Sequence, residues 1–275
     1  MKLQDLIKKT EQIFKENGLV DARLEAGYLA GFFFKYSTAQ LYLHLNEEVD
    51  EELFMQQVVT RRLSGEPTAY ITGWQEFYGL PFKVNKNTLI PRPETELLVG
   101  KILNLYCKKE DLTVFDVGTG SGAIAVTLAQ KLKNAHVWAL DISPQALEVA
   151  KENAVLNKTS NICFLASNLL TEVGRQKADL IVANLPYVPY GQAQTHGFEP
   201  YNALYCEGKD PLKLIKKLAV QLKCHLNLDG GVFLEVGMGQ AQEVLSILHK
   251  NLPDIKNSGI EKDLAGIERV VWAQI

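Results

Sequence analysis

Cysteine is scarce in this chain and never occurs in pairs. Only four of its 275 residues are cysteine, and neither a Cys-x-x-Cys spacing nor a histidine at ligand spacing accompanies them. This pattern argues against a disulfide framework and a structural zinc site, and it predicts reduced, packed thiols typical of the reducing cytosol. The four positions are Cys107, Cys163, Cys206 and Cys224.

Long apolar runs are also missing. The most apolar stretch, residues 26–34, is too short to cross a bilayer. The N-terminus has no charged start followed by an apolar segment and a cleavage site. We therefore expect a cytoplasmic protein that does not associate with a membrane.

The chain has a net charge of -3 and no basic stripe, so direct binding to nucleic acid is not expected. Hydrophobic residues at 47% and charged residues at 22% are ordinary for a globular protein and exclude the disordered and fibrous classes. The length allows one large domain or two unequal ones, and we expect two. Because no exposed apolar helix stands out in the sequence, we expect a monomer.

The first part of the chain has a helical pattern. Apolar residues recur at steps of three and four from Leu3 to Phe14. Asp21 is placed to cap a second helix, which carries the aromatic cluster Phe32 to Phe34, and a third helix is expected over residues 50–62. These helices predict a small bundle over residues 1–72 that recognises a partner and holds no catalytic residue.

The sequence Gly-Glu-Pro at 65–67 ends this helical pattern, and residues 76–84 then read as a short hairpin. We assign the hairpin to a connector over residues 73–93. The connector ends in Pro-Arg-Pro, and Pro93 or the residue after it can open a helix. Two proline rings hold Arg92 more firmly than a simple linker requires, which indicates a role in placing a substrate.

Strands and helices alternate from residue 112 to the C-terminus. This alternation predicts a doubly wound, Rossmann-like α/β domain over residues 94–275, with a mostly parallel, seven-stranded sheet. The last two strands look like a closing antiparallel pair. The expected strands are 113–117, 136–142, 162–166, 180–183, 231–236, 260–263 and 269–273.

A glycine-rich turn joins the first of these strands to a helix. Its glycines allow a sharp bend and let a ligand approach the free N–H groups of the helix start. The turn also satisfies the dinucleotide fingerprint Gly-x-Gly-x-x-Gly/Ala, and Asp141 can hold ribose hydroxyls of a nicotinamide or an S-adenosylmethionine cofactor. Both cofactors therefore stay open at this point. The turn consists of Gly118, Thr119, Gly120, Ser121 and Gly122.

Other residues favour a methyl donor over a dinucleotide. Asp116 lies two positions before the first glycine, where its carboxylate can face the cationic end of S-adenosylmethionine. Asn168, after the third strand, is placed to read the adenine edge. The fourth strand ends in Asn-Leu-Pro-Tyr at 184–187, at the sheet edge where ligands bind, and no hydride-transfer apparatus is evident.

The Asn-Leu-Pro-Tyr sequence suits methyl transfer to a planar nitrogen. An amide nitrogen is a poor nucleophile because its lone pair is delocalised, and two acceptors that each take one N–H hold it still and favour its pyramidalisation. Asn184 Oδ1 and the main-chain carbonyl of Leu185 are candidates for these acceptors. Pro186 stiffens the turn, and Tyr187 is expected to pack on the planar group.

The chain resembles the PrmC (HemK) family, the peptide chain release factor glutamine methyltransferases, over nearly its whole length. The most specific mark is Pro-Arg-Pro-Glu-Thr-Glu at 91–96. The resemblance implies methyl transfer from S-adenosylmethionine to N5 of the glutamine in the Gly-Gly-Gln loop of class 1 release factors. It also implies that the helical N-terminal domain helps to dock the release factor. The other matching segments are 64–67, 77–82, 116–125, 184–187 and 198–200.

Carried over to this chain, the family pattern assigns cofactor binding to residues 118–122, Asp141 and Asn168, and substrate binding to residues 184–187. Two positions depart from it. The family usually has a proline where this chain has Leu185, whose carbonyl is nevertheless kept. The family often has aspartate where this chain has Asn168, which can still accept a hydrogen bond from adenine but without a charge.

Two other functions stay open. An adenine-N6 methyltransferase of nucleic acids shares Asn-x-Pro-Tyr but needs a basic cleft and a base-flipping pocket. A binding module that has lost catalysis is conceivable because of Leu185. Glu235, near the end of the fifth strand, can be a buried structural carboxylate as readily as a site residue, and it is left out of the site. Glu199 and Pro200 are expected to shape the loop after Tyr187, which could close over the substrate as a flap.

Overall fold

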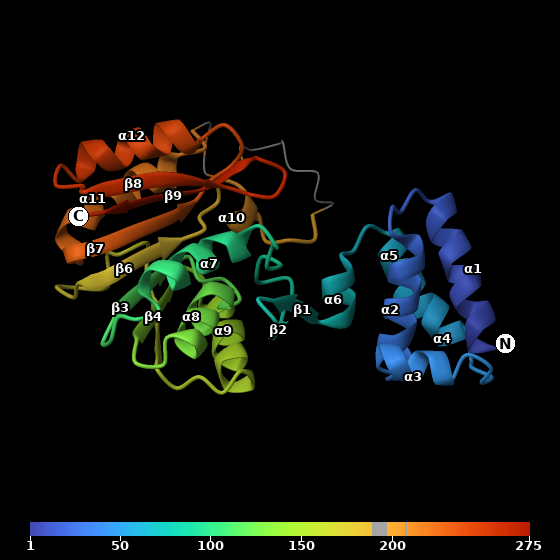
Figure 1. Cartoon of the computed structure of the whole chain (residues 1–275). Coiled ribbons are helices and arrows are strands. Elements are labelled where there is room, and N and C mark those ends of the chain that lie inside the picture. The colour runs from blue at the N-terminus through green and yellow to red at the C-terminus, as the bar shows by residue number, and fades with distance from the viewer. Residues whose placement is uncertain (189–196, 207, 209) are drawn as a thin grey trace. The chain divides into compact units, whose positions relative to one another are not determined.

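The computed structural model describes residues 1–188, 197–206, 208 and 210–275. The chain divides into two compact units, Met1–Trp74 and Gln75–Ile275 (Figure 1). No described helix is both long enough and apolar enough to cross a membrane.

The first unit is built from helices. One continuous helical stretch, Glu52 to Leu63, corresponds to the predicted third helix and contains a π-helical turn. A short helix starting after Ser37 was not predicted, although Ser37 and Gln40 form a capping box that marks its start. The elements are α1 (Leu3–Glu16), α2 (Ala22–Phe34), α3 (Thr38–Leu43), α4 (Glu52–Phe54), the π turn (Met55–Val59), α5 (Thr60–Leu63) and α6 (Thr68–Thr72).

The aromatic cluster of α2 is split between the core and the surface. Phe33 and Phe34 pack against the buried ring of Phe54, as expected for a core cluster. Phe32 is exposed, together with Tyr28 and Leu24, which lie one and two turns earlier on the same face. An exposed apolar helix face is therefore present on α2. The expectation of a monomer assumed that no such face exists, so this assumption no longer supports it.

Asp21 occupies the N-cap position of α2, but its side chain makes no capping hydrogen bond, so the predicted side-chain cap is wrong. Its backbone has φ -98° and ψ 37°, outside the extended conformation from which an N-cap side chain normally reaches the first-turn N–H groups. The helix begins at the predicted place without this bond.

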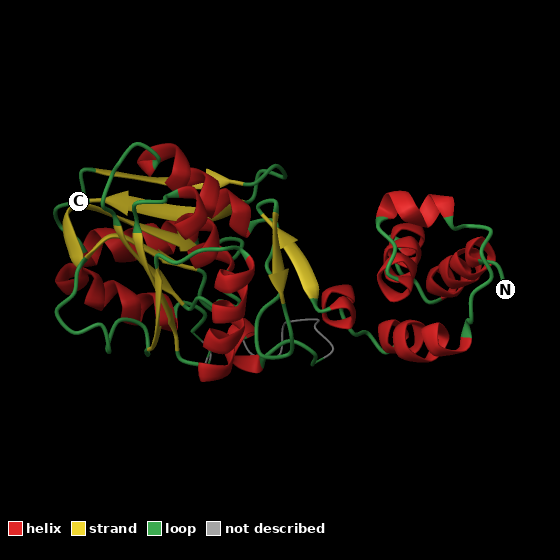
Figure 2. Ribbon diagram, turned by 90° about the horizontal axis from the view of Figure 1, so that it is seen from below, coloured by secondary structure: helices red, strands yellow, loops and turns green. Residues whose placement is uncertain are grey.

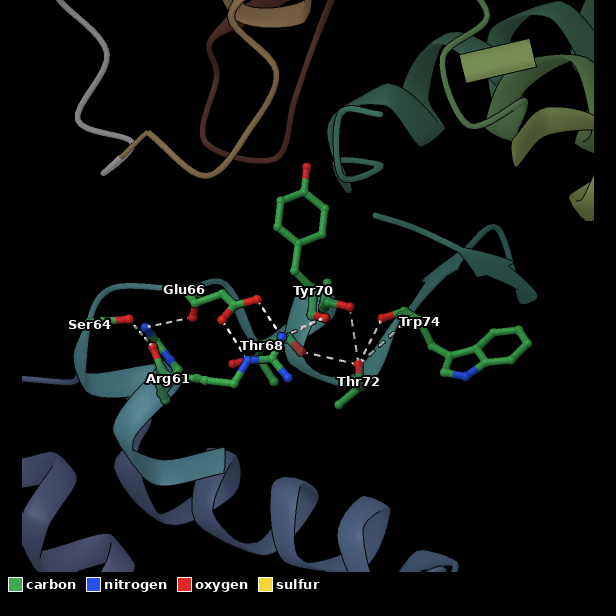
Figure 3. A network of polar contacts seen from close by, with 9 residues as sticks. Arg61, Ser64, Glu66, Thr68, Tyr70, Thr72 and Trp74 are labelled. Carbon is green, nitrogen blue, oxygen red and sulfur yellow. Dashed lines mark hydrogen bonds and ion pairs between the residues drawn. The ribbon is translucent and has the colours of Figure 1, made fainter. Parts of the chain in front are cut away.

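Figure 3 shows a polar network that fixes the turn between α5 and α6. Arg61 donates from Nε and Nη2 to the two carboxylate oxygens of Glu66, at 2.7 and 2.5 Å. Ser64 Oγ donates to the main-chain oxygen of Arg61 at 2.6 Å. The Gly-Glu-Pro sequence that ends the long helix is thus held by a bidentate ion pair, and Pro67 then sits at the N-cap of α6.

The second unit contains a hairpin followed by alternating strands and helices, as predicted. The hairpin consists of β1 (Trp74–Phe77) and β2 (Leu80–Lys83). The elements that follow it are α7 (Thr95–Tyr106), β3 (Thr113–Val117), α8 (Ala123–Lys131), β4 (His136–Asp141), α9 (Pro144–Leu156), β5 (Ile162–Ala166), β6 (Ala178–Ala183), α10 (Tyr201–Leu204), α11 (Lys213–His225), β7 (Leu226–Glu235), α12 (Ala241–Asn251), β8 (Asn257–Lys262) and β9 (Glu268–Gln274).

The seven-stranded sheet has the order β5-β4-β3-β6-β7-β9-β8. The strands from β5 to β7 are parallel to one another, and β9 runs antiparallel to both β7 and β8, so the predicted Rossmann-like fold is confirmed. Helices cover both faces of the sheet (Figure 2). The core side chains of α7 and α8 lie on one face, and those of α11 and α12 on the other.

The chain order reverses between β3 and β6. From β3 the sheet first grows outward through β4 and β5, and the chain then returns to place β6 on the other side of β3. In open α/β sheets, the crevice at the carboxyl ends of the strands beside such a reversal is where ligands bind. The end of β3 and the end of β6 therefore flank the expected site.

The hairpin is tied to the rest of the second unit. Tyr78 and Gly79 have φ values of 53° and 74°, the positive φ that a two-residue type I′ turn needs at both central positions. The main-chain N–H of Tyr78 donates to Glu96 Oε1 at 2.8 Å. Asn153 of α9 accepts from the main-chain N–H of Lys83 at 2.7 Å and donates to its carbonyl at 2.9 Å.

The four cysteines are free thiols. Only Cys206 is buried, so the prediction of packed thiols is wrong for Cys107, Cys163 and Cys224, which are exposed. Cys163 lies on β5, which is an edge strand of the sheet, and Cys107 lies just after the last residue of α7.

Candidate active site

A cavity of about 350 Å³ lies at the carboxyl ends of the parallel strands. It is lined by residues that directly follow β3, β4, β5 and β6, and by the loop that leads into α7. All the predicted site residues line it except Asp116, Gly122 and Tyr187. Those that line it are Arg92, Gly118, Thr119, Gly120, Ser121, Asp141, Asn168, Asn184, Leu185 and Pro186.

The glycines of the turn after β3 have different roles. A Cβ on Gly122 would lie 3.0 Å from Ala150 Cβ, so this glycine permits the close packing of the turn against α9. A Cβ on Gly120 would meet nothing within 4 Å, and φ of 56° places this residue in the left-handed region. Gly120 thus leaves its side of the cavity open to a ligand.

Asp141, at the end of β4, fixes the glycine-rich turn by hydrogen bonds. Its Oδ2 accepts from the main-chain N–H of Gly120 at 2.8 Å, and its Oδ1 accepts from that of Ser143 at 2.9 Å. Burial raises the pKa of this carboxyl, while these two hydrogen bonds lower it. Because each carboxylate oxygen can accept a second bond, Asp141 keeps capacity for the hydroxyls of a ligand.

Asp116 is buried beneath the turn and does not line the cavity. Its Oδ2 accepts from Thr119 Oγ1 at 2.6 Å and from the main-chain N–H of Ala125 at 3.1 Å. Burial raises the pKa of this carboxyl to about 7. The side chain therefore supports the glycine-rich turn and the first turn of α8. The predicted contact of Asp116 with the cationic end of a cofactor stays a prediction.

Asn184 lies at the end of β6, and its side chain is fixed from behind. Its Nδ2 donates to Thr95 Oγ1 at 3.2 Å, and Thr95 is the first residue of α7. The next residue, Leu185, is almost completely buried, and its Cδ2 would lie 3.1 Å from a Cβ on Gly118. The turn that carries Asn184 and Pro186 is thus held by the packing of the Leu185 side chain.

Tyr187 lies beside the cavity and faces β7. Its hydroxyl is 3.5 Å from Glu235 Oε1, and its main-chain oxygen accepts from Gln240 Nε2 at 3.2 Å. Burial and then the charge of Glu235 raise the pKa of Tyr187 to about 12, so the phenol stays neutral. Packing of Tyr187 on a planar substrate group remains a prediction.

Arg92 and Glu199 form an ion pair, with 2.6 Å between Nη2 and Oε2. Glu199 is 2% exposed and also accepts from the main-chain N–H of Ile90 at 3.2 Å. The structure thus joins the Pro-Arg-Pro loop to the segment that carries Glu199. Most of the predicted flap, residues 189–196, lies outside the described residues.

Several cavity residues were not predicted. Ile142 is 64% exposed at the cavity, directly after Asp141, and Leu169 and Ala146 add further apolar surface. For Ile142 and Leu169, the position just after a strand is the sequence signal that could have found them, whereas Ala146 lies in the first turn of α9. Glu235 is 2% exposed beside Tyr187, although the sequence analysis left it out of the site.

The sheet order, the glycine-rich turn after β3 and the carboxylate at the end of β4 define an S-adenosylmethionine-dependent methyltransferase fold. Among solved structures, a ribosomal protein L11 methylase from Lactobacillus delbrueckii subsp. bulgaricus is 29% identical with a TM-score of 0.50, covering 66% of this chain and 79% of that chain. The family model of the ribosomal protein L11 methyltransferase (PrmA) matches residues 92–186, and that of the PrmC N-terminal domain matches residues 5–73.

Two curated relatives identify the family more closely. The release factor glutamine methyltransferase of Koribacter versatilis is 41% identical over 90% of this chain and 90% of its own length. That of Fusobacterium nucleatum is 34% identical over 98% of this chain and 78% of its own length. The chain belongs to the release factor glutamine methyltransferase family, and the predicted resemblance is confirmed.

Proposed function

We propose that this protein transfers a methyl group from S-adenosylmethionine to N5 of the glutamine in the Gly-Gly-Gln motif of class 1 release factors. The observation that most supports the proposal is that Asn184 and Leu185 line the same cavity as the turn at residues 118–121. A pair of amide-holding acceptors and a cofactor-binding turn are both needed for methyl transfer to an amide nitrogen. Family membership supplies the acceptor.

The residues present fit the cofactor. Gly120 leaves room for a ligand to approach the backbone, and Asp141 keeps acceptor capacity for the cis-diol of a ribose. Ile142 and Leu169 offer apolar surface for an adenine ring, and Asn168 lies exposed on the same wall. When bound, S-adenosylmethionine supplies an electrophilic methyl group on its sulfonium.

The chain itself holds the acceptor amide. In the proposed complex, Asn184 Oδ1 and the carbonyl of Leu185 each accept one N–H of the glutamine side chain. These two bonds orient the nitrogen lone pair toward the methyl group and favour pyramidalisation. No base has to remove a proton first, because the nitrogen becomes acidic only after it is methylated, and it then releases one proton to water. Leu185 serves through its carbonyl, so its departure from the family pattern leaves the chemistry intact.

Release factors act at the ribosome, so we place the activity in the cytoplasm, with a protein as the partner and no direct binding to nucleic acid. The monomer expected from the sequence stays a prediction, which sedimentation of the purified protein would check.

The test is transfer of label from S-adenosylmethionine to a purified class 1 release factor. The Gly-Gly-Gln→Gly-Gly-Ala release factor serves as the acceptor control, and Asn184→Ala as the enzyme control. We expect label only on the intact motif, and loss of one preorganised acceptor should slow transfer by about 10²- to 10³-fold. If the cofactor binds but no release factor is labelled, the acceptor assignment is wrong, and duplex DNA is the substrate to try next.

A further inference from the structure

Glu235 is a buried carboxylate to which the proposed reaction gives no task. It ends β7, is 2% exposed, and its Oε2 has no hydrogen-bond partner among the described residues. A polar group in such a place costs stability, because it gives up its contacts with water without replacing them. The neighbours of this carboxylate indicate what it does.

Glu235 lies beside the residue that is proposed to hold the substrate amide. Strands β6 and β7 are adjacent and parallel, with Ala183 opposite Leu234, so the residues that follow each of them lie at neighbouring strand ends. The side chains of Thr95 and Asn184 both favour the charged form of the Glu235 carboxyl. Asn184 Nδ2 donates to Thr95 Oγ1 at 3.2 Å. Thr95 Oγ1 therefore lies on the NH₂ side of the Asn184 amide, and the Glu235 carboxylate ends the neighbouring strand.

This arrangement bears on which way the Asn184 amide is turned. A side-chain amide has nearly the same shape after a half-turn, but the turn exchanges an acceptor for a donor. Oxygen acceptors on one side attract the NH₂ group to that side and leave Oδ1 on the other. In the opposite orientation the NH₂ group of Asn184 would face the NH₂ group of a glutamine substrate, and both would be donors.

We propose that Glu235 is a positioning residue that, together with Thr95, turns the Asn184 amide so that Oδ1 faces the acceptor nitrogen. This inference rests on the proposed function. Glu235 does not touch the substrate and moves no proton, and its effect is exerted through Asn184.

The charge of Glu235 gives the role a pH dependence. Burial raises its pKa to about 7, against the opposing influences of Thr95, Arg269 and Asn184, while Glu94 raises it further. Tyr187 faces it with a phenol whose pKa is raised to about 12. Below pH 7 the carboxyl is protonated, becomes a weaker acceptor that can also donate, and selects the NH₂ group of Asn184 less strongly. The rate should therefore rise as the pH increases through 7.

The test compares Glu235→Gln and Glu235→Ala with the wild type and with Glu243→Gln, an exposed glutamate on α12 that serves as the matched control. Initial rates of release-factor methylation are measured from pH 6 to 8.5, and calorimetry gives the affinity for S-adenosylmethionine. We expect kcat of Glu235→Ala to fall by about 10²-fold, as for a misplaced reacting group, with cofactor affinity unchanged. Glu235→Gln should keep the fold and lose the rise in rate near pH 7, while Glu243→Gln keeps it.

A second readout does not depend on turnover. The side-chain NH₂ signals of Asn184, assigned by their loss in Asn184→Ala, should titrate near pH 7 in the wild type and stay constant in Glu235→Gln. Wild-type rates in both variants with an unchanged pH profile would overturn the positioning role while leaving the proposed function intact. A wild type that labels no release factor would overturn the proposed function, and the NMR titration would then decide on Glu235 by itself.

Discussion

Arg92 Nη2 lies 2.6 Å from Glu199 Oε2, which joins two segments that are 107 positions apart in the chain. The two partners differ in exposure, since the side chain of Arg92 is 38% exposed and that of Glu199 is 2% exposed. Removing the arginine would strand a buried carboxylate, whereas removing the charge of the glutamate would leave the arginine partly in water. The pair should therefore respond unequally to substitution.

We expect Arg92→Ala to lower the free energy of unfolding by about 2 kcal/mol, in the range for a hydrogen bond to a charged group, and Glu199→Gln to lower it by less. Urea unfolding of both variants and of the double variant measures the difference. Lys83→Ala, which breaks an exposed ion pair with Glu152, is the control and should cost about 0–1 kcal/mol. Equal losses for Arg92→Ala and Lys83→Ala would contradict this account of the pair.

The central parallel strands β3 and β6 could be predicted because they are buried on both faces and read as continuous apolar runs, as β6 does just before Asn184. The start of β7 could not be predicted. This strand begins at Leu226, and its first part includes the polar residues Asn227 and Asp229, which break the apolar pattern of a strand. Main-chain hydrogen bonds pair neighbouring strands, so a strand can include polar residues that the local sequence assigns to a loop.

The site shows the same division. The turn at 118–122 and the Asn-Leu-Pro-Tyr sequence could be found because chemistry of this kind is placed at strand ends. The direction of Asp116 could not be read from its position two residues before Gly118, because only the fold brings Thr119 and Ala125 to its carboxylate. The pairing of Arg92 with Glu199 likewise depends on contacts between distant segments.

Leu185 should matter through its side chain for stability and through its carbonyl for rate. It is 4% exposed and packs over Gly118. Leu185→Ala is expected to cost about 2–5 kcal/mol, because it leaves a cavity in the core. Leu185→Pro keeps the carbonyl and restricts Asn184 to an extended conformation, so we expect its kcat to stay within about tenfold of the wild type even if stability falls. Urea unfolding and methylation rates of both variants separate the two roles.

Were Leu185→Pro to lose transfer completely while remaining folded, the main-chain carbonyl would not suffice for holding the substrate. An unfolded Leu185→Pro would instead show that the packing over Gly118 also sets the fold, which thermal unfolding of that variant would reveal.

Asp116 should make the folded state lose stability as the pH rises. Its folded pKa is about 7 against an ordinary value of 3.8, so between these values the folded state binds more protons than the unfolded state. The contribution is fully present below about pH 4 and is lost as the pH rises through 7. A pKa difference of one unit corresponds to about 1.4 kcal/mol. Asp116→Asn should therefore reduce the decrease in the free energy of unfolding between pH 5 and pH 7 by about 2 kcal/mol.

The measurement for Asp116 is the free energy of unfolding in urea at pH 5, 6, 7 and 8, without cofactor. Glu235 also has a pKa of about 7, so part of the fall in stability with pH should persist in Asp116→Asn and become smaller when Glu235→Gln is added. Parallel curves for the wild type and Asp116→Asn would show that the buried carboxylate does not titrate in this range.

Two glycines of the turn after β3 should fail in different ways when replaced by alanine. Both have positive φ, of 56° for Gly120 and 81° for Gly122, so each replacement carries a strain of about 1 kcal/mol. A Cβ on Gly122 would also press against Ala150 at 3.0 Å, whereas a Cβ on Gly120 would enter open space. Gly122→Ala is therefore expected to lower stability more, by about 1–3 kcal/mol of overpacking.

Gly120→Ala should instead weaken the binding of S-adenosylmethionine, because its methyl group occupies the wall that the ligand approaches. Calorimetric titration with the cofactor and thermal unfolding without it, on both variants, give the two quantities. Gly174→Ala, at a positive φ of 69° outside the cavity and with no atom within 4 Å of the new Cβ, controls for strain alone. Cofactor affinity equal in Gly120→Ala and Gly174→Ala would mean that the backbone at Gly120 does not face the bound ligand.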